Sequence, residues 1–524
     1  MKKLKCILMC GLLATSLLGC GASNKPQETP SQSSQVTEST SQAAAEGQDT
    51  VNTGKTELNM PLSVDPDGLD PQRTTAASTF QITNNIYEPL LSVNTDGTLK
   101  PALATDWSVS EDGLTITFTL REGAKFSNGN VCDANAVVAS FERLKGEESP
   151  RANDYKNIVS MEAIDEKTVV FTTETLDVTI LSSFAYPWAA IVDVTAADTL
   201  KNQPVGTGAY VVEEWIPQQS LVLKKNPDYP GTVNLEKINF KNIPDATAQI
   251  SAFHNGELDI IGISGDQIAA FENDDNYKMM SAPANSLQLM AMNLENEALS
   301  DERVRQAINY AIDKDALIET VWWGAGEKIG SHYPTVLKEY VDYSNQYPYN
   351  VEKAKELLKE AGYENGLTLQ MSLPKSYPAY VDAGQIIANQ LKEINITCEV
   401  TIIEWAEWLS DVYNGRQYDL TVVGHTGRLD PYVLLARYHS ESSENYFNYK
   451  NEEVDELLTN YKSEMDEEKR TEITKRIEQI LAEEVPALYI QTPITNYVMQ
   501  KDVEGFASYP IDIYEMKDVY FTGE

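Results

Sequence analysis

The chain contains little cysteine. Five cysteines occur in 524 residues, and only Cys132 and Cys398 lie beyond the first twenty positions. There is no CxxC pair and no cluster of cysteine and histidine with zinc-site spacing, which excludes the usual structural zinc sites. Spacing alone leaves two interpretations of Cys132 and Cys398 open, a disulfide or two buried free thiols, and we favour the buried free thiols.

Cationic side chains are scarce relative to acidic ones, and long apolar runs are missing beyond the first twenty residues. The 41 Lys and Arg residues stand against 79 Asp and Glu, which gives a net charge of −38. Such a surface repels nucleic acid and anionic lipid headgroups, so we expect neither as a direct partner. We expect a soluble body. A local group of cations can still bind an anionic ligand.

Several motifs of enzymes and nucleotide-binding proteins are absent. The chain has no G-x-x-x-x-G-K-[ST] phosphate loop, no G-x-S-x-G serine motif and no H-E-x-x-H zinc motif. We therefore expect that the protein is not an enzyme and uses no cofactor. A secreted hydrolase is the alternative, which hydrolysis of candidate peptides by the purified protein would reveal.

The first residues have the pattern of an export signal. A basic start is followed by an apolar run, 6–18, that ends at Gly19-Cys20. This order is typical of secretion signals, and the run is shorter than the roughly 20 residues that span a bilayer. Cys20 directly after a small residue resembles the lipobox of bacterial lipoproteins. The resemblance implies a cleaved signal peptide, 1–19, and a lipid on the Cys20 thiol; an ordinary signal peptide is the alternative.

A polar segment separates this signal from the body. Residues 20–55 consist largely of Ser, Thr, Gln, Ala, Glu and Pro, with almost no large apolar side chains. Such a segment cannot bury enough apolar surface to offset the entropy lost on ordering. We predict that it is a disordered tether between the lipid and a body that begins near Thr56.

The body alternates between strand and helix patterns. Strict alternation of apolar and polar residues over 114–120 predicts a half-buried strand, which follows a turn at Asp112-Gly113. Further strands are predicted at 107–109, 169–171, 221–223, 238–240, 367–373, 398–403 and 420–423. Together with the helices between them, these strands predict α/β architecture with a mixed sheet.

Helices are predicted where apolar residues recur on one face. These stretches are 304–312, 351–361, 386–394, 454–461 and 473–480. Ser300 is predicted to cap the first of them, and Gly362 to end the second. The charged run 464–470 is predicted to be a solvated connection.

Six blocks of sequence, in order along the chain, carry a family pattern. They are 103–129 with its continuation to 143, 204–210 (PVGTGAY), 226–231, 256–259, 301–308 and 430–431. Together they resemble the extracytoplasmic solute-binding proteins of peptide and nickel ABC importers, family 5. The resemblance covers the chain from about Thr56 to its end.

The resemblance implies a two-lobed α/β fold of the periplasmic-binding-protein type (type II, cluster C). Two hinge strands would join the lobes, which close on a ligand, and an extra domain would be inserted in the first lobe. The implied divisions are 56–86, 204–291 and 494–524 for lobe 1, 87–203 for the inserted domain, and 292–493 for lobe 2.

The loop 424–432 is the strongest candidate for ligand contact, because it follows the apolar strand 420–423 and binding groups gather in loops after strands. Family members that bind free peptides carry an Asp in this loop for the ligand's α-ammonium, and this chain has Arg428 at the comparable place. A guanidinium repels an ammonium and pairs with carboxylate or phosphate. We predict that Arg428 contacts ligand; a salt bridge or lobe-closure contact is the alternative. Asp430 either serves an amine or, as the resemblance favours, forms a structural Asp-Pro turn.

Other candidate ligand contacts are Lys375, His425, Trp405, Tyr432, Asp67 and Trp188. Lys375 lies near where dipeptide binders carry an Arg for the ligand's carboxylate; a solvated loop lysine is the alternative. Trp405 either walls a pocket or packs in the core. Nickel-chelate binders of the family use a histidine contact, but His425 and His439 without a nearby carboxylate or Cys cluster are a weak metal signal. We predict that His425 is a hydrogen-bonding group of the pocket and that there is no metal site.

These observations predict the substrate-binding lipoprotein of an ABC importer. It would be a monomer, held by lipid on Cys20 at the outer face of the cell membrane, that delivers a peptide or peptide-like solute to a permease pair and its ATPases. Arg428 and Lys375 favour a solute with exposed negative charge. A nickel-, metallophore- or oligosaccharide-binding member of the family, or a peptide-sensing receptor without transport, remains the alternative.

Overall fold

The computed structural model describes residues 54–523. The predicted signal peptide, Cys20 and the tether up to residue 53 lie outside the described residues. None of the described helices is both long and apolar enough to cross a membrane. Cys132 and Cys398 are both free thiols, as predicted, but only Cys132 is buried, whereas Cys398 is partly exposed.

Four strands from distant parts of the chain form the first sheet, in the order β1-β10-β9-β8. They are β1 (Glu57–Leu62), β8 (Tyr210–Ile216), β9 (Ser220–Lys225) and β10 (Lys237–Asn242). β1 runs parallel to β10, and the other pairs are antiparallel. Leu58, Met60 and Leu62 of β1 are buried, because successive side chains of a strand point to opposite faces. The strands predicted at 221–223 and 238–240 are confirmed.

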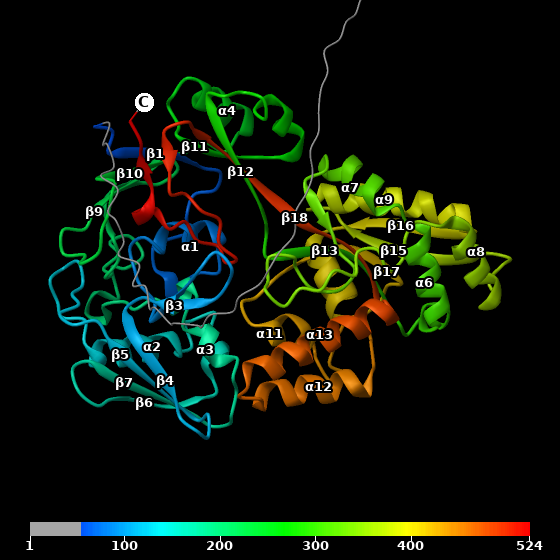
Figure 1. Ribbon diagram of the computed structural model, residues 1–524, viewed down its shortest axis with the longest axis horizontal. Helices are drawn as coiled ribbons and strands as arrows, with labels where there is room; N and C mark the ends of the chain where they lie inside the picture. The colour runs from blue at the N-terminus through cyan, green and yellow to red at the C-terminus, as the bar shows by residue number, and fades with distance from the viewer. Residues whose placement is uncertain (1–53, 524) are drawn as a thin grey trace, which may run out of the picture. The chain divides into compact units, whose positions relative to one another are not determined.

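The second sheet has four antiparallel strands, in the order β4-β5-β7-β6, with a helix packed on it (Figure 1). The elements are β4 (Ala104–Val109), β5 (Thr115–Leu120), β6 (Ile158–Ala163), β7 (Thr168–Thr173) and α2 (Ala134–Leu144). Gly113 has φ of +69° in the turn between β4 and β5, a conformation that glycine adopts without strain. Phe141 of α2 packs on Phe171 of β7, with ring centroids 4.9 Å apart. The strands predicted in this region and their turn are confirmed.

The largest sheet contains eight strands and is mixed, as predicted. They are β11 (Ile260–Ile263), β12 (Tyr277–Pro283), β13 (Ser286–Met292), β14 (Gly326–Lys328), β15 (Leu367–Pro374), β16 (Ile396–Ile403), β17 (Leu420–Thr426) and β18 (Ala487–Gln500). β15 is parallel to β16 and β17, whereas β13 is antiparallel to β17 and β18.

The long strand β18 belongs to both parts of this sheet. Its residues 487–491 pair with β13, and its residues 494–500 pair with β12. One continuous strand therefore runs from the part that holds β13, β15, β16 and β17 to the part that holds β11 and β12 (Figure 1). The lobe and insert boundaries given above stay predictions.

Helices cover the large sheet on both faces. The longer ones are α6 (Glu302–Ala311), α7 (Lys314–Trp322), α8 (Val351–Glu360), α9 (Pro378–Leu391), α12 (Glu452–Ser463) and α13 (Glu467–Glu484). Met290 and Met292 of β13 pack with α6 to α9, whereas Leu287 and Leu289 pack with α12 and α13. Successive side chains of β13 point to opposite faces of the sheet and therefore pack into two separate cores. The predicted helical stretches are confirmed.

Shorter elements complete the described chain. They are α1 (Ala77–Thr83), α3 (Ile180–Ser183), α4 (Ala246–His254), α5 (Glu297–Ser300), α10 (Trp405–Glu407), α11 (Pro431–Leu435), β2 (Leu91–Val93), β3 (Leu99–Pro101), β19 (Val503–Glu504) and β20 (Tyr520–Phe521). β2 pairs with β3, and β19 pairs with β20, each as an antiparallel two-stranded ribbon.

Two predictions about helix starts were wrong. Ser300 ends α5, where its hydroxyl donates to Glu297 O at 2.7 Å, and Asp301 caps α6 by accepting from Arg303 N at 2.9 Å. The charged run 464–470 is not only a connection, because α13 begins within it. Asp466 caps that helix, and the acidic residues that follow stabilise a helix N-terminus through the dipole. The prediction that Gly362 follows the end of α8 is confirmed, with φ of +89°.

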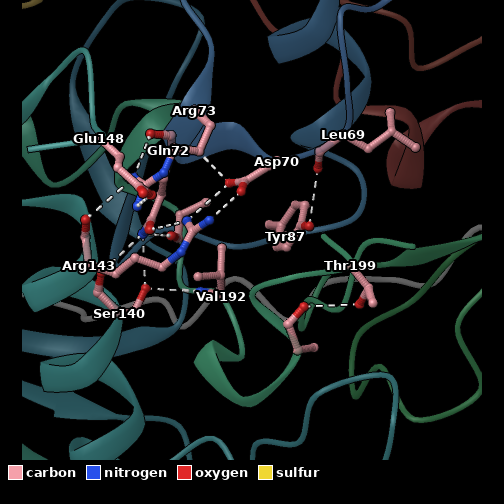
Figure 2. Close-up of polar contacts among 12 residues, drawn as sticks. Leu69, Asp70, Gln72, Arg73, Tyr87, Ser140, Arg143, Glu148, Val192 and Thr199 are labelled. Carbon is pink, nitrogen blue, oxygen red and sulfur yellow. Dashed lines mark hydrogen bonds and ion pairs between the residues drawn. The ribbon is translucent and has the colours of Figure 1, made fainter. Parts of the chain in front are cut away.

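A buried polar network joins α2 to the loop after β1, as Figure 2 shows. The Arg143 guanidinium makes two contacts with the Asp70 carboxylate and donates to Gln72 Oε1 at 2.8 Å. Gln72 Nε2 donates in turn to Ser140 Oγ at 3.0 Å. The Arg143 and Asp70 side chains are only 13% and 7% exposed. This pair therefore fixes the second sheet and its helix to the N-terminal strand region.

Candidate ligand-binding cleft

A cavity of about 450 Å³ lies where six stretches of the chain meet beside the end of β17. It is lined by Ala77, Phe80 and Gln81 of α1, by residues 186–188, 284–286 and 426–428, by Thr495 and Tyr497 of β18, and by residues 507–514. A concave site assembled from several elements, with a few polar groups among apolar walls, is the usual form of a small-molecule site.

A second cavity, of about 260 Å³, adjoins the first. It is lined by Ser286, Leu287, Gln288, Tyr377, Tyr380, Trp405, Val423, Gly424, His425, Thr426 and Pro493. Ser286 and Thr426 line both cavities, and they are paired across β13 and β17. The two cavities therefore meet at the paired ends of these strands.

Aromatic rings wall the smaller cavity. Tyr377 stacks on Tyr380 at 5.2 Å and meets Trp405 edge-on at 5.1 Å. Trp405 stacks on the buried Trp408 at 4.8 Å, and Trp408 Nε1 donates to Thr421 Oγ1 at 2.9 Å. The buried tryptophan thus holds the exposed face of Trp405 in place.

A stacked aromatic pair also walls the larger cavity. The rings of Tyr186 and Trp188 lie 4.2 Å apart and nearly parallel, and the Arg151 guanidinium sits 4.3 Å above the Trp188 ring. Leu429 N donates to Tyr186 Oη at 2.9 Å, which ties this wall to the loop after β17. Burial raises the pKa of Tyr186 to about 12, so the phenol is neutral at physiological pH.

Asn285 connects two walls of the larger cavity. Its Nδ2 donates to Arg428 O at 3.2 Å and to Pro510 O at 2.9 Å. Gly427 N donates to Asn285 O at 2.7 Å. A Cβ on Gly427 would lie 1.7 Å from Asn285 Oδ1, so the loop can approach the asparagine this closely only with glycine there.

Arg428 lines the larger cavity, and its guanidinium has no close counter-ion among the described residues. Among residues 54–523, no carboxylate oxygen lies within 4.0 Å of it. Its charged neighbours at longer range are Asp512, Asp154 and Arg151. The surrounding protein raises the pKa of both carboxyl groups, and the Arg428 charge opposes that rise.

Comparison with known proteins places the chain in a family. Residues 98–446 match the family described as bacterial extracellular solute-binding proteins, family 5. The chain belongs to this family. The resemblance predicted from the six sequence blocks is thereby confirmed.

Relatives in family 5 match this chain over most of its length. The dipeptide-binding protein of Escherichia coli (strain K12) is 27% identical over 495 residues, which are 87% of this chain and 92% of the relative. The glutathione-binding protein GsiB of Shigella flexneri serotype 5b is 27% identical over 471 residues, which are 86% and 91% of the two chains. These relatives are named as binding proteins, which supports the prediction that the chain is not an enzyme.

A solved structure supports the predicted fold class. HbpA2 from Haemophilus parasuis matches with a TM-score of 0.83 and 25% identity, over 89% of this chain and 100% of that one. The predicted two-lobed fold of extracytoplasmic solute-binding proteins is confirmed.

Four of the residues predicted to contact ligand lie at these cavities in the family 5 fold. Arg428 and Trp188 line the larger cavity, and His425 and Trp405 line the smaller one. Ligand contact by these residues stays a prediction.

Lys375 and Asp67 line neither cavity. Lys375 forms an ion pair with Glu404 at 2.5 Å, and both side chains are 64% exposed. Asp67 accepts hydrogen bonds from the hydroxyls of Thr74 and Thr79, each at 2.8 Å. Lys375 therefore already has a counter-ion, and Asp67 already accepts hydrogen bonds from two hydroxyls.

Asp430 and Tyr432 also lie outside the two cavities. Asp430 caps α11 by accepting from Tyr432 N at 2.9 Å, with Pro431 at the first helical position. Tyr432 stacks on Tyr461 of α12 at 5.9 Å. This arrangement is the structural Asp-Pro turn that the resemblance favoured.

His425 belongs to a buried polar network. Its Nδ1 lies 3.2 Å from His332 Nε2 and 3.0 Å from Arg437 Nη1, and its Nε2 lies 3.0 Å from Tyr446 Oη. Burial, with the Arg437 charge, holds the pKa of His425 well below its usual range. His439 lies elsewhere, 3.9 Å from Asp455. Within residues 54–523, no group of three or more His, Cys, Asp or Glu side chains could hold a metal ion.

No pattern in the sequence indicates that Asn285 or the stretch 507–514 would line the cavity. Neither lies in a periodic segment, and both line the cavity because distant parts of the chain meet there. Tyr377 and Tyr380, which line the smaller cavity, are not among the predicted contacts, although they lie on either side of Pro378 and close to Lys375.

Proposed function

We propose that this chain is the substrate-binding lipoprotein of an ABC importer and captures a peptide or peptide-like solute that presents a carboxylate to Arg428. In this proposal, lipid on Cys20 holds the protein at the outer face of the cell membrane. The bound solute passes to a permease pair driven by its ATPases.

One observation carries the proposal for the ligand. Arg428 lines a cavity that has aromatic walls, and no carboxylate of the described chain lies within 4.0 Å of its guanidinium. A guanidinium in such a place offers paired donors that match a carboxylate. Relatives named for binding dipeptides and glutathione bind molecules that carry carboxylates, which supports the same class for this chain.

We expect Arg428→Ala to weaken peptide binding roughly 10- to 100-fold, because hydrogen bonds to a charged group contribute about 1.5–3 kcal/mol. The probe is a library of all natural dipeptides and their Ala-extended tripeptides, screened by thermal shift. The best binder is then measured by isothermal titration calorimetry. Its C-terminal amide should bind wild type as weakly as the free peptide binds Arg428→Ala.

Lys375→Ala is the matched control, since it removes a cation that pairs with Glu404 and lines neither cavity. We expect unchanged affinity in this variant. Equal binding of the free peptide and its amide by wild type would refute the carboxylate contact. Native mass spectrometry that found a neutral sugar bound to the purified protein would do so as well.

Cys20→Ala tests the anchor separately. Cells that express this variant should release the protein into the soluble extracytoplasmic fraction, because the thiol that would carry the lipid is missing. Wild type should stay with the membrane and gain mass from its acyl chains. A membrane-bound Cys20→Ala protein would contradict lipid anchoring at this residue and leave the ligand proposal intact.

A further inference from the structure

A small polar contact joins the second sheet to α12 outside both ligand cavities. Asp177, in the loop between β7 and α3, forms an ion pair with Lys462 of α12, and 2.9 Å separates Asp177 Oδ2 from Lys462 Nζ. Val178 N donates to the carbonyl oxygen of Lys462 at 3.1 Å. None of these three residues lines the larger or the smaller cavity. The contact can therefore affect ligand binding only indirectly.

The loop around Asp177 fixes its carboxylate before the lysine is considered. Asp177 Oδ1 accepts from Thr179 N at 3.1 Å and from Thr179 Oγ1 at 2.7 Å. This leaves Oδ2 for Lys462, and the Asp177 side chain is only 15% exposed. A group that is already held in its bound position loses little conformational entropy when its partner arrives.

Lys462 contributes two groups from the last turn of α12. Its carbonyl is one of those at a helix C-terminus that lack a partner within the helix, and Val178 N supplies that partner. Its ammonium lies 5.4 Å from the centre of the Tyr432 ring. Burial lowers the pKa of Lys462, but the hydrogen bond to Asp177 and the charge of that carboxylate more than offset this and raise the pKa above its usual value. The ion pair is therefore charged at physiological pH.

The two parts that meet at this contact have separate hydrophobic cores. Phe141 and Phe171 belong to the core beside the second sheet, whereas Val454 and Leu458 of α12 belong to another. A cavity of about 460 Å³, lined by residues of both parts, lies between them and borders the contact at Val178. Relative motion is the usual expectation for parts of a chain that are not joined by a large hydrophobic interface.

The same two parts also meet at the wall of the larger cavity. There Leu429 N donates to Tyr186 Oη, and Leu429 is next to Arg428. In the predicted division of the chain, Tyr186 and Asp177 belong to the domain inserted in lobe 1, whereas Leu429 and Lys462 belong to lobe 2. The ion pair therefore holds together, outside the cleft, the same parts that face each other across it.

We infer that Asp177 and Lys462 form a latch that holds the two lobes closed over the bound solute and slows its release. The inference rests on the proposed function and adds two positioning residues that do not touch the solute. A contact that forms only in the closed state shifts the equilibrium between open and closed states toward closure by its own free energy. A solute that leaves only from the open state then dissociates more slowly.

The test measures release of the best dipeptide from the library screen by stopped-flow tryptophan fluorescence. Lys462→Met removes the ammonium and keeps most of the stem, and Asp177→Asn removes the charge and keeps the acceptor for Thr179. Each variant should release the peptide roughly 3- to 10-fold faster than wild type, as expected for loss of a partly buried ion pair. The association rate should change less than about 2-fold, because the open state that admits the peptide is unaltered.

Lys237→Met is the matched control. Lys237 forms an ion pair of 2.7 Å with Glu213, and the two side chains are 37% and 35% exposed, but both residues lie in the first sheet. No opening of the lobes separates them, so we expect wild-type release in this variant.

Two further measurements distinguish a latch from a pair that only stabilises the fold. The double variant Asp177→Asn/Lys462→Met should release the peptide no faster than the faster single variant, because both changes remove the same contact. The ratio of release rates between Lys462→Met and wild type should approach one as NaCl rises from about 0.05 to about 0.5 M, since salt screens the ion pair of wild type.

The outcomes separate this inference from the proposed function. Unchanged release from Lys462→Met and Asp177→Asn, or an equal acceleration in Lys237→Met, would overturn the latch, and the proposed function would stand because the same peptide still binds. If no peptide of the library binds wild type, both are overturned. Unchanged circular dichroism and melting temperature of the ligand-free variants exclude misfolding as the cause of faster release.

Discussion

Arg143→Ala is expected to lower the free energy of unfolding by about 3–5 kcal/mol, because it leaves the buried Asp70 carboxylate without its cation. Two contacts between these side chains and the bond from Arg143 to Gln72 are lost together. The measurement is urea denaturation followed by tryptophan fluorescence and by circular dichroism.

Arg476→Ala is the matched control. Arg476 also forms two hydrogen bonds to one carboxylate, at 2.7 and 3.0 Å to Glu453, but the two side chains are 40% and 50% exposed. Water replaces the lost partner there, so we expect a loss below about 1 kcal/mol. The double variant Asp70→Asn/Arg143→Ala should recover part of the stability. Equal losses in Arg143→Ala and Arg476→Ala would contradict the role given to the buried pair.

Asp430→Asn is expected to stabilise the protein at pH 8 by up to about 4 kcal/mol and to change little at pH 4. Burial raises the pKa of Asp430 to about 7, against about 3.9 in an unfolded chain. Between those values the folded state holds a proton that the unfolded state has released. The free energy of unfolding therefore falls as pH rises through this window. Asparagine keeps the cap on α11 and removes the charge.

Asp301→Asn provides a control with the opposite sign. Asp301 also caps a helix, but hydrogen bonding to Arg303 lowers its pKa. Its charge therefore stabilises the fold above its unfolded pKa, and this contribution is lost as pH falls through the lower folded value. We expect Asp301→Asn to lose stability at pH 8. Urea titrations at pH 4, 6 and 8 measure the free energy of unfolding of wild type and both variants. If the effect of Asp430→Asn on this free energy did not change with pH, Asp430 would not be a buried charge.

Much of the fold was predictable because its elements repeat a simple pattern. Apolar and polar residues alternate strictly over 114–120, and this pattern alone predicts a strand with one buried face. β18 was not predicted as one long strand. It is buried on both faces over 487–492, so no alternation marks it, and its register depends on β12 and β13 from distant parts of the chain.

The site was predictable only in part. Arg428 follows an apolar strand, and that local rule was enough to predict its place at the cavity. The side chains that surround it come from turns. Asn285 and Asp512 each lie at the centre of a three-residue turn, and nothing in the nearby sequence indicates that these two turns meet. Their placement depends on contacts between residues more than two hundred positions apart, such as Asn285 with Pro510.

The first and last parts of the described chain meet on one side of the first sheet. The Lys55 ammonium forms an ion pair with Asp259 and lies 4.4 Å from the centre of the Phe521 ring. A linker of a few residues would therefore be long enough to join these ends into a closed ring. The same arrangement of segments could then form from a chain in which their order is circularly permuted. We expect a circular permutant with its new ends in an exposed turn to keep the cavity walls in place.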